Sequence, residues 1–276
     1  MSVFLKYLIK KVDGMKRIGI ILATIIFIVS TLMFARELWR GYSEESAFEG
    51  IRGLFEASDK VLDIIVLEPP SEAEGNLDES EEQSTQVLDK FYELTQINED
   101  IKGWVRIKDT NISYPVMQTM NDEEYYLHRN YQKEYSLSGT PFLDADADIT
   151  QDSNQLVIYG HNMKNGTMFK DILKYRKENF WKTNSIISFD TLFEKGNYKI
   201  FAAIEMDCEK GNGHFPFYQY NKFDNEEEFG GFLTEIKSLS IYDTGILPEY
   251  GDELLTLVTC SKYNGNDRMI VMAVKE

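Results

Sequence analysis

The chain has 276 residues, of which 43% are hydrophobic, and its formal net charge at pH 7 is −17. This apolar content, with 17 Phe and 16 Tyr, supports a substantial core and argues against global disorder. The acidic balance argues against a nucleic-acid partner, because phosphate binding requires clustered Lys and Arg. It suits a solvated domain or a basic partner.

The N-terminal part of the chain has the pattern of a membrane anchor. Residues 18–35 form an 18-residue stretch without a charge, and as a helix it would span about 27 Å of a roughly 30 Å bilayer core. Five Lys or Arg residues and one Asp precede it. The positive-inside rule therefore predicts a cytoplasmic basic arm at 1–17, a transmembrane anchor at 18–35 and export of the rest. A cleaved signal peptide is the alternative, although its apolar region would be shorter and end in a small-x-small site.

Residues 36–85 are predicted to form a juxtamembrane stalk and an acidic linker. Apolar residues are spaced as in a helix over residues 37–67. Residues 68–84 contain seven acidic residues and no basic one, and such a run cannot bury enough apolar surface to order itself. The linker would tether a folded domain at 86–276.

That domain is expected to begin with a helix and to continue as short strands. Apolar residues recur at helical spacing over 87–97, with Ser84 or Thr85 as the cap. A second helix is expected at 226–239, where Asn225 and Glu228 have the spacing of a capping box. Eight runs of strand character, separated by Gly, Asn and Asp, lie at 104–107, 112–116, 140–143, 155–159, 186–189, 198–205, 253–259 and 269–274. This pattern predicts a mainly β domain closed into a barrel, which removes exposed sheet edges.

Three chemically reactive side chains lie at the ends of strand-like runs. Cys260 ends one run, Arg268 begins the next, and His161 follows the run at 155–159. A free thiol has a pKa of about 8.5, so a thiolate nucleophile requires nearby positive charge. His161 can supply that charge or act as a general acid, and Arg268 can stabilise an oxyanion. From spacing alone, Cys260 as a buried core thiol is the alternative.

The other Cys and His residues are expected to be structural or solvated. Cys208 is either a free core thiol or, in an oxidising compartment, the partner of Cys260 in a disulfide. His128 lies among aromatic residues and is predicted to be structural, whereas His214 lies in a Gly-containing loop and is predicted to be solvated. A zinc site from these residues and His161 lacks a closely spaced ligand pair.

The acidic run at 144–148 resembles a calcium loop only in part. An EF-hand register starting at Asp144 places Ile149 where Gly is required and Gln155 where Glu is required. The run is therefore predicted to be a solvated turn, with an adventitious calcium site as the alternative. No Gly-rich phosphate loop is present in the sequence, and we expect neither a metal nor a cofactor at the site.

The motifs around the three reactive residues resemble those of the sortase family, class B in particular. The resemblance rests on Thr-Leu-Val-Thr-Cys ending at Cys260 with Arg268 downstream, and on Tyr-Gly-His-Asn-Met around His161. The sequence INEDIKGW at 97–104, and YYL followed by GTPFLD between residues 125 and 144, add to it. The resemblance extends from about residue 86 to the last residue of the sequence.

This resemblance implies a closed eight-stranded sortase-type β-barrel with N-terminal helices and a helical insertion before the Cys strand, matched here by 226–239. It also implies a membrane-anchored cysteine transpeptidase (a thiol endopeptidase) of Gram-positive bacteria. Such enzymes cleave a sorting signal near the C-terminus of a secreted protein, hold the acyl group as a thioester and pass it to an amine of peptidoglycan. By analogy, Cys260 is the nucleophile, His161 the acid and base, and Arg268 the oxyanion and substrate-positioning residue.

The implied location is the cell membrane, crossed once, with the N-terminus cytoplasmic and the catalytic domain extracellular. The implied partners are secreted proteins bearing a sorting signal, a peptidoglycan amine and the membrane. Three alternatives remain open. They are a pilin-polymerising class C sortase, which typically has a lid and a second anchor not expected here, a plain cysteine endopeptidase, and a non-catalytic anchored binding domain.

Overall fold

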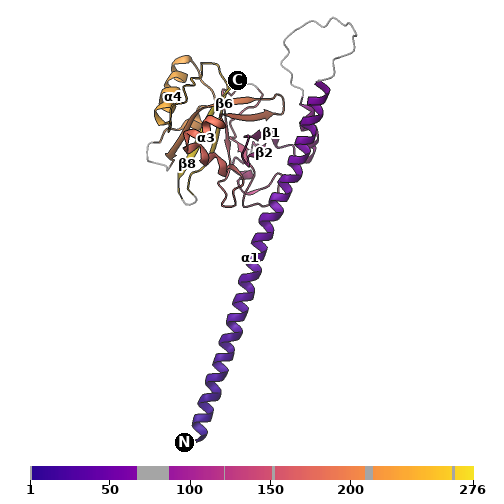
Figure 1. Cartoon of the computed structure of the whole chain (residues 1–276), viewed down its shortest axis with the longest axis vertical. Helices are drawn as coiled ribbons and strands as arrows, with labels where there is room; N and C mark the ends of the chain where they lie inside the picture. The colour runs from indigo at the N-terminus through magenta and orange to yellow at the C-terminus, as the bar shows by residue number, and fades with distance from the viewer. Residues whose placement is uncertain (1, 67–86, 121, 151–152, 209–213, 263–264) are drawn as a thin grey trace. The chain divides into compact units, whose positions relative to one another are not determined.

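The computed structural model describes residues 2–66, 87–120, 122–150, 153–208, 214–262 and 265–276 (Figure 1). The chain divides into two compact units, Met1–Glu49 and Gly50–Glu276. All eight strands lie in the second unit.

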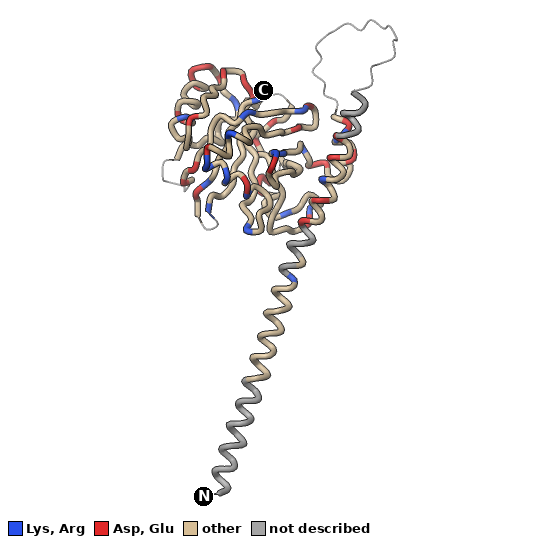
Figure 2. Tube along the Cα trace, viewed as in Figure 1, with Lys and Arg blue, Asp and Glu red and all other residues tan. Residues whose placement is uncertain are grey.

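The N-terminal helix α1 runs over Ser2–Val66, so the helical conformation predicted for 37–67 is confirmed as far as Val66. The described part of its charge-free stretch, residues 20–35, is tan in the trace of Figure 2. Among the residues that the structure describes, no helix is both long enough and apolar enough to cross a membrane. The transmembrane anchor at 18–35 stays a prediction, and the acidic linker at 68–84 lies outside the described residues.

Eight strands close into one barrel in the order β1-β2-β3-β4-β7-β8-β6-β5, as the sequence pattern predicted. Each predicted run overlaps one strand. Pairs β2–β3 and β4–β7 are parallel, and the other neighbours are antiparallel. The strands are β1 Ile101–Arg106, β2 Ser113–Met117, β3 Phe142–Leu143, β4 Gln155–Tyr159, β5 Ile186–Thr191, β6 Asn197–Asp207, β7 Leu254–Cys260 and β8 Asp267–Lys275.

One short helix precedes β1, and further helices and 3₁₀ turns lie in the connections between the strands. They are α2 Asp89–Ile97, η1 Tyr125–His128, η2 Phe169–Arg176, α3 Glu178–Thr183, η3 Phe217–Gln219 and α4 Glu226–Leu239. The predicted cap of α2 at Ser84 or Thr85 is wrong: the cap position is Leu88, whose side chain makes no capping bond. Position 88 is where the chain bonds to the barrel, since Leu88 N–H donates to the carbonyl oxygen of Leu192 at 2.7 Å.

The predicted cap of α4 is confirmed, although the return bond of the capping box goes to the residue before the cap. Asn225 Oδ1 accepts a hydrogen bond from the backbone N–H of Glu228 at 3.0 Å. The Glu228 carboxylate reaches back to the N–H of Asp224 at 2.8 Å, one residue before the cap. The apolar face of α4 then packs with residues of β6, β7 and β8 in one buried cluster, as its helical spacing requires.

The last turns of α1 belong to the same compact unit as the barrel, although the sequence assigned them to the stalk. Phe55 is fully buried, and its ring stacks on that of Trp104 in β1 at 4.4 Å between centroids. The aromatic pair buries a large apolar area on both sides of the contact. The folded unit therefore begins well before α2.

A buried ion cluster joins α1, α2, β1 and β5. The Lys90 ammonium is fully buried and lies 2.6 Å from Asp190 and 3.3 Å from Asp59. Arg106 contacts both carboxylates at 3.1 Å. Burial raises the pKa of Asp59, but Lys90, Arg106 and Lys195 lower it more, so it lies below its usual range. Each cation of the cluster contacts both carboxylates, so no buried charge lacks a partner of opposite sign.

Substituting Lys90→Met is expected to lower the free energy of unfolding by about 3 kcal/mol, because Asp190 then keeps Arg106 as its remaining cation from this cluster. Equilibrium urea unfolding followed by Trp fluorescence measures the change. The matched control is Lys182→Met, which breaks an exposed pair with Glu178 of similar length, 2.7 Å. It should cost less than about 0.5 kcal/mol. Equal losses in the two variants would contradict a structural role for the buried cluster.

Candidate active site

Two neighbouring parallel strands bring His161 and Cys260 to one end of the barrel. β4 and β7 pair in parallel, and the last pair in the register is Tyr159 with Val258. Continuing the register by two residues places His161 beside Cys260. Parallel strands have their carboxyl ends at the same edge of a sheet, so both residues lie at that edge although they are far apart in sequence.

Hydrogen bonds continue the register beyond the end of β4. Gly160 N–H donates to the Val258 carbonyl at 3.0 Å, and the Thr259 hydroxyl donates to the Gly160 carbonyl at 2.7 Å. The buried Asn162 donates its side-chain N–H to the carbonyl oxygen of Cys260 at 2.8 Å. The chain on both sides of His161 is thus bound to the strand that carries Cys260. Sequence reasoning did not single out Asn162, although it sits in the Gly-His-Asn motif.

Gly160 has a packing reason to precede the histidine. A Cβ at this position would lie 2.6 Å from the ring of Phe169, which opens η2. The Phe169 N–H donates to the His161 carbonyl at 2.9 Å. Only a residue without a side chain allows this close approach, which fixes the backbone of His161 against η2.

Strand pairing also brings Arg268 next to Cys260. β7 and β8 pair antiparallel, with Cys260 directly opposite Arg268. Directly opposed residues of neighbouring strands project to the same face of a sheet. The guanidinium donates to the carbonyls of Gly265 and Asp267, both at 3.3 Å. The spacing of Arg268 in the sequence could not establish this proximity, because the connecting loop has no fixed length.

Ser261, the residue after Cys260, is hydrogen-bonded by an arginine of η2. Arg176 at the end of η2 donates to the Ser261 carbonyl at 3.0 Å. Its guanidinium also bonds both oxygens of Glu205 in β6, at 2.7 and 2.9 Å. This bidentate pair fixes the orientation of the guanidinium. The backbone of Cys260 is therefore bonded both at its own carbonyl, by Asn162, and at the next one.

The imidazole of His161 has a defined tautomer. Its Nε2 lies 2.9 Å from the carbonyl oxygen of Leu127 in η1. A carbonyl can only accept, so Nε2 carries a hydrogen and any proton exchanged in a reaction is exchanged at Nδ1. Burial lowers the pKa of His161 and the hydrogen bond to Leu127 raises it in part; the charge of His128 lowers it further. The net pKa is below its usual range.

His128 lies against this histidine, so its assignment as a purely structural residue was incomplete. The two rings stack with centroids 5.8 Å apart and an interplanar angle of 25°. The aromatic neighbours of His128 suggested a structural role. Its contact with His161 could not be seen in the sequence, because the two residues are far apart along the chain. His214, predicted to be solvated, is half-buried, and its Nδ1 is buried without a partner among the described residues.

Both cysteines are free, so the alternative of a Cys208–Cys260 disulfide is wrong. Cys208 directly follows β6, and its N–H donates to the Asn266 carbonyl at 3.1 Å. Burial raises the pKa of its thiol, and the charge of Arg268 offsets part of that rise. Cys208 is therefore a mostly protonated thiol near the site at neutral pH.

The described residues contain no group of three His, Cys, Asp or Glu side chains able to hold a metal ion. The acidic turn at 144–148 uses its carboxylates locally. Asp144 accepts from the N–H of Asp146 at 3.1 Å and from the Tyr159 hydroxyl at 3.1 Å, and Asp148 accepts from the N–H of Thr150 at 2.7 Å. These bonds are typical of Asx turns.

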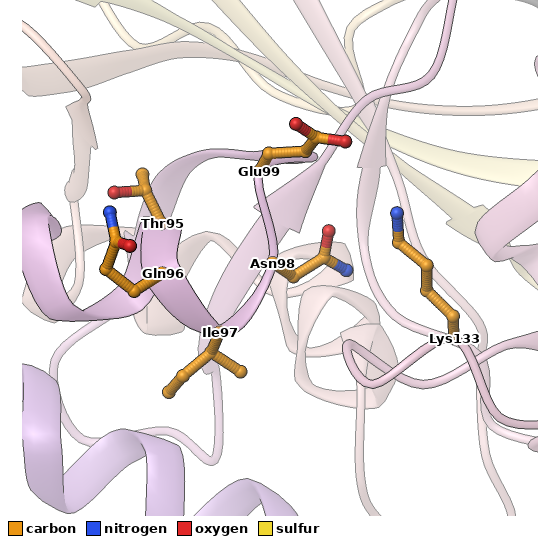
Figure 3. Close-up of a pocket in the computed structure, with 6 residues that line it drawn as sticks. All are labelled: Thr95, Gln96, Ile97, Asn98, Glu99 and Lys133. Atoms are coloured by element: carbon orange, nitrogen blue, oxygen red, sulfur yellow. The ribbon is translucent and has the colours of Figure 1, made fainter.

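A polar hollow lies apart from these residues, at the C-terminal end of α2. Residues of α2 and its cap line one side, and Lys133 lines the other (Figure 3). The lining residues are Thr95, Gln96, Ile97, Asn98, Glu99 and Lys133. None of the predicted site residues lines it, so it is not part of the Cys260 site.

Comparison with known proteins gives one consistent family. A family model described as Sortase domain matches residues 105–276. Sortase B of Listeria monocytogenes is 33% identical over 176 residues, which cover 63% of this chain and 68% of the relative. Sortase B of Staphylococcus aureus is 28% identical over 190 residues, which cover 68% of this chain and 75% of the relative. The solved structure of sortase B from Bacillus anthracis in complex with AAEK1 matches with a TM-score of 0.68 at 28% identity, covering 86% of this chain and 98% of that one.

Replacing Asn162 by Ala is expected to lower the free energy of unfolding by about 1–3 kcal/mol, because the Cys260 carbonyl loses its donor. Urea unfolding measures the loss, and hydrogen exchange at the end of β7 locates it. Asn165→Ala is the matched control: Asn165 is exposed and accepts only from Thr167 in its own turn among the described contacts. It should cost less than about 0.5 kcal/mol. If the two variants were equally stable, the bond from Asn162 would not hold the Cys260 strand end.

Proposed function

Because this chain belongs to the sortase family, we propose that it cleaves a C-terminal sorting signal of secreted proteins, forms a thioester on Cys260 and transfers the acyl group to a peptidoglycan amine. The similarity to sortase B proteins places it in class B, and it is an enzyme of the cysteine transpeptidase type. The observation that carries the proposal is the position of β7 between β4 and β8. Cys260 therefore has His161 on one neighbouring strand end and Arg268 on the other.

The chemistry follows from this arrangement. The Cys260 thiolate attacks the scissile carbonyl, a carbon–sulfur bond forms, and the carbon–nitrogen bond breaks as the amine leaves. His161, protonated at Nδ1, gives that proton to the leaving amine. Its lowered pKa makes the imidazolium a stronger acid for this step. Arg268, on the same face of the sheet as Cys260, stabilises the negative charge on the carbonyl oxygen.

The second half reverses these roles. An acceptor amine attacks the thioester carbonyl, a carbon–nitrogen bond forms, and the carbon–sulfur bond breaks to return the Cys260 thiolate. His161 takes the proton that the amine loses. A water molecule in place of the amine would give hydrolysis, the endopeptidase reaction. The helix α4 before β7 supports class B over a pilin-polymerising type.

Substituting Cys260→Ala is expected to abolish cleavage and thioester formation, because no other described thiol lies at the end of β7. The measurement uses a peptide library with Thr at the cleaved position, with and without hydroxylamine, which captures thioesters. Mass spectrometry of the protein detects the acyl adduct. Cys208→Ala is the matched control and should keep the adduct on Cys260.

Each outcome of this experiment selects one function. Wild-type cleavage that yields a hydroxamate only with hydroxylamine supports transpeptidation. Cleavage with the same products regardless of the amine would identify a plain endopeptidase. No adduct and no cleavage in the wild type, with peptide binding retained in Cys260→Ala, would identify a binding domain.

Sortases are associated with the cell surface, and we propose that residues 18–35 anchor this chain there, with the catalytic domain outside. The support is the uncharged 18-residue stretch behind a basic arm and the exposure of its described large apolar side chains, between 49 and 72%. An exposed apolar surface of this kind is typical of a segment that lipid or another protein covers.

Deleting residues 18–35 is expected to move the protein from the membrane fraction to the soluble fraction of cells, because the apolar stretch is lost. Alkaline carbonate extraction followed by immunoblotting distinguishes the two fractions. Deletion of residues 68–84, a stretch of similar length with seven acidic residues, is the control and should leave the protein in the membrane. A wild-type chain that extracts fully with carbonate would overturn the anchor.

A further inference from the structure

The 3₁₀ turn η1 contacts His161 in two ways. The Leu127 carbonyl accepts the Nε2 hydrogen of His161 at 2.9 Å, and the next residue, His128, stacks its ring on the imidazole at 5.8 Å between centroids. The hydrogen bond to Leu127 orients the imidazole, and His128 puts a second titratable ring beside it. The proposed reaction at Cys260 gives a role to the hydrogen bond but none to His128.

η1 is itself held in place, so the histidine pair has a fixed geometry. The Tyr126 hydroxyl donates to Asp100 at 2.7 Å and accepts from the side chain of Asn98 at 2.7 Å. Asp100 in turn pairs with Lys133 at 2.9 Å. The carbonyl of His128 accepts from the Ser136 N–H at 3.0 Å. The stacking of His128 on His161 is therefore built into the fold rather than left to a free loop.

Among the residues that the structure describes, the other charged groups around this pair come from η1, β7 and β8. Arg129, the next residue after η1, turns its guanidinium onto the Tyr125 ring at 4.1 Å and donates to the Tyr125 carbonyl. From β7 and β8 the neighbours are Cys260 and Arg268, which follow from the strand register. The charge of His128 lowers the pKa of His161.

We propose that His128 is a positioning residue that acts through His161 and controls the pH at which His161 takes up the catalytic proton. This inference rests on the proposed role of His161 as the acid and base. Two imidazolium rings at this distance repel each other, so protonation of one disfavours protonation of the other. A positive charge on His128 therefore makes protonation of His161 less favourable. His128 thereby destabilises the protonated form of His161 and favours release of its proton to the leaving amine.

The test is a charge series at position 128, read by NMR titration of the imidazoles in the full-length protein in detergent micelles. The chain has three histidines, and His161→Gln and His214→Gln assign their signals. His128→Gln, which is neutral, should raise the titration midpoint of His161 by about half a pH unit or more; His128→Lys, a permanent cation, should lower it by a similar amount. A structural role alone would not reverse sign with charge.

The coupling is mutual, so a charge on either ring disfavours protonation of the other. His214→Gln is the control and should leave the midpoint of His161 unchanged. Midpoints of His161 that agree within about 0.1 pH unit across the charge series would overturn the proposal.

The activity profile separates this proposal from the proposed function. In His128→Gln the pH dependence of kcat/KM for peptide cleavage should move toward higher pH, in step with the midpoint of His161. A profile that stays in place while activity falls would show that His128 acts through folding alone and overturn the inference. Thioester formation that survives in His161→Gln would instead sink the acid–base role of His161, whatever the titrations show.

Discussion

The parallel pairing of β4 with β7 is the constraint on which the site depends. Parallel neighbours end at the same edge of the barrel, so His161 after β4 and Cys260 at the end of β7 lie at one edge although they are far apart along the chain. β7 has β8 on its other side in antiparallel register, which puts Arg268 opposite Cys260. The barrel order thus assembles a thiol, an imidazole and a guanidinium without any of them lying on a free loop.

The strand ends are made rigid by groups that do no chemistry themselves. Asn162 and Arg176 bond the carbonyls of Cys260 and Ser261, and Gly160 lets the chain before His161 pack on a ring. A nucleophile and its acid must be held close to reacting geometry, and such backbone contacts supply that. In the same way, we infer that the fixed position of His128 controls the proton affinity of His161, because its charge acts on the imidazole at a fixed distance.

Sequence patterns located most of the barrel because strands and helices leave local periodicities. All eight strand runs and α4 with its Asn225 cap were found this way. The start of α2 was misplaced because Leu88 is bonded to Leu192, a long-range contact that no cap motif reveals. The inclusion of Phe55 in the folded unit was missed for a similar reason: its partner, Trp104, lies on β1.

The amino-acid sequence by itself determined the family, the barrel of eight strands and the identity of Cys260, His161 and Arg268 as candidates, because these depend on motifs and periodicities within short windows of chain. Only the tertiary structure decided which side chains meet. It placed Arg268 opposite Cys260, kept Cys208 and Cys260 as free thiols, and stacked His128 on His161. Register and packing between distant segments set these contacts, and no local pattern encodes the register of two strands that are far apart along the chain.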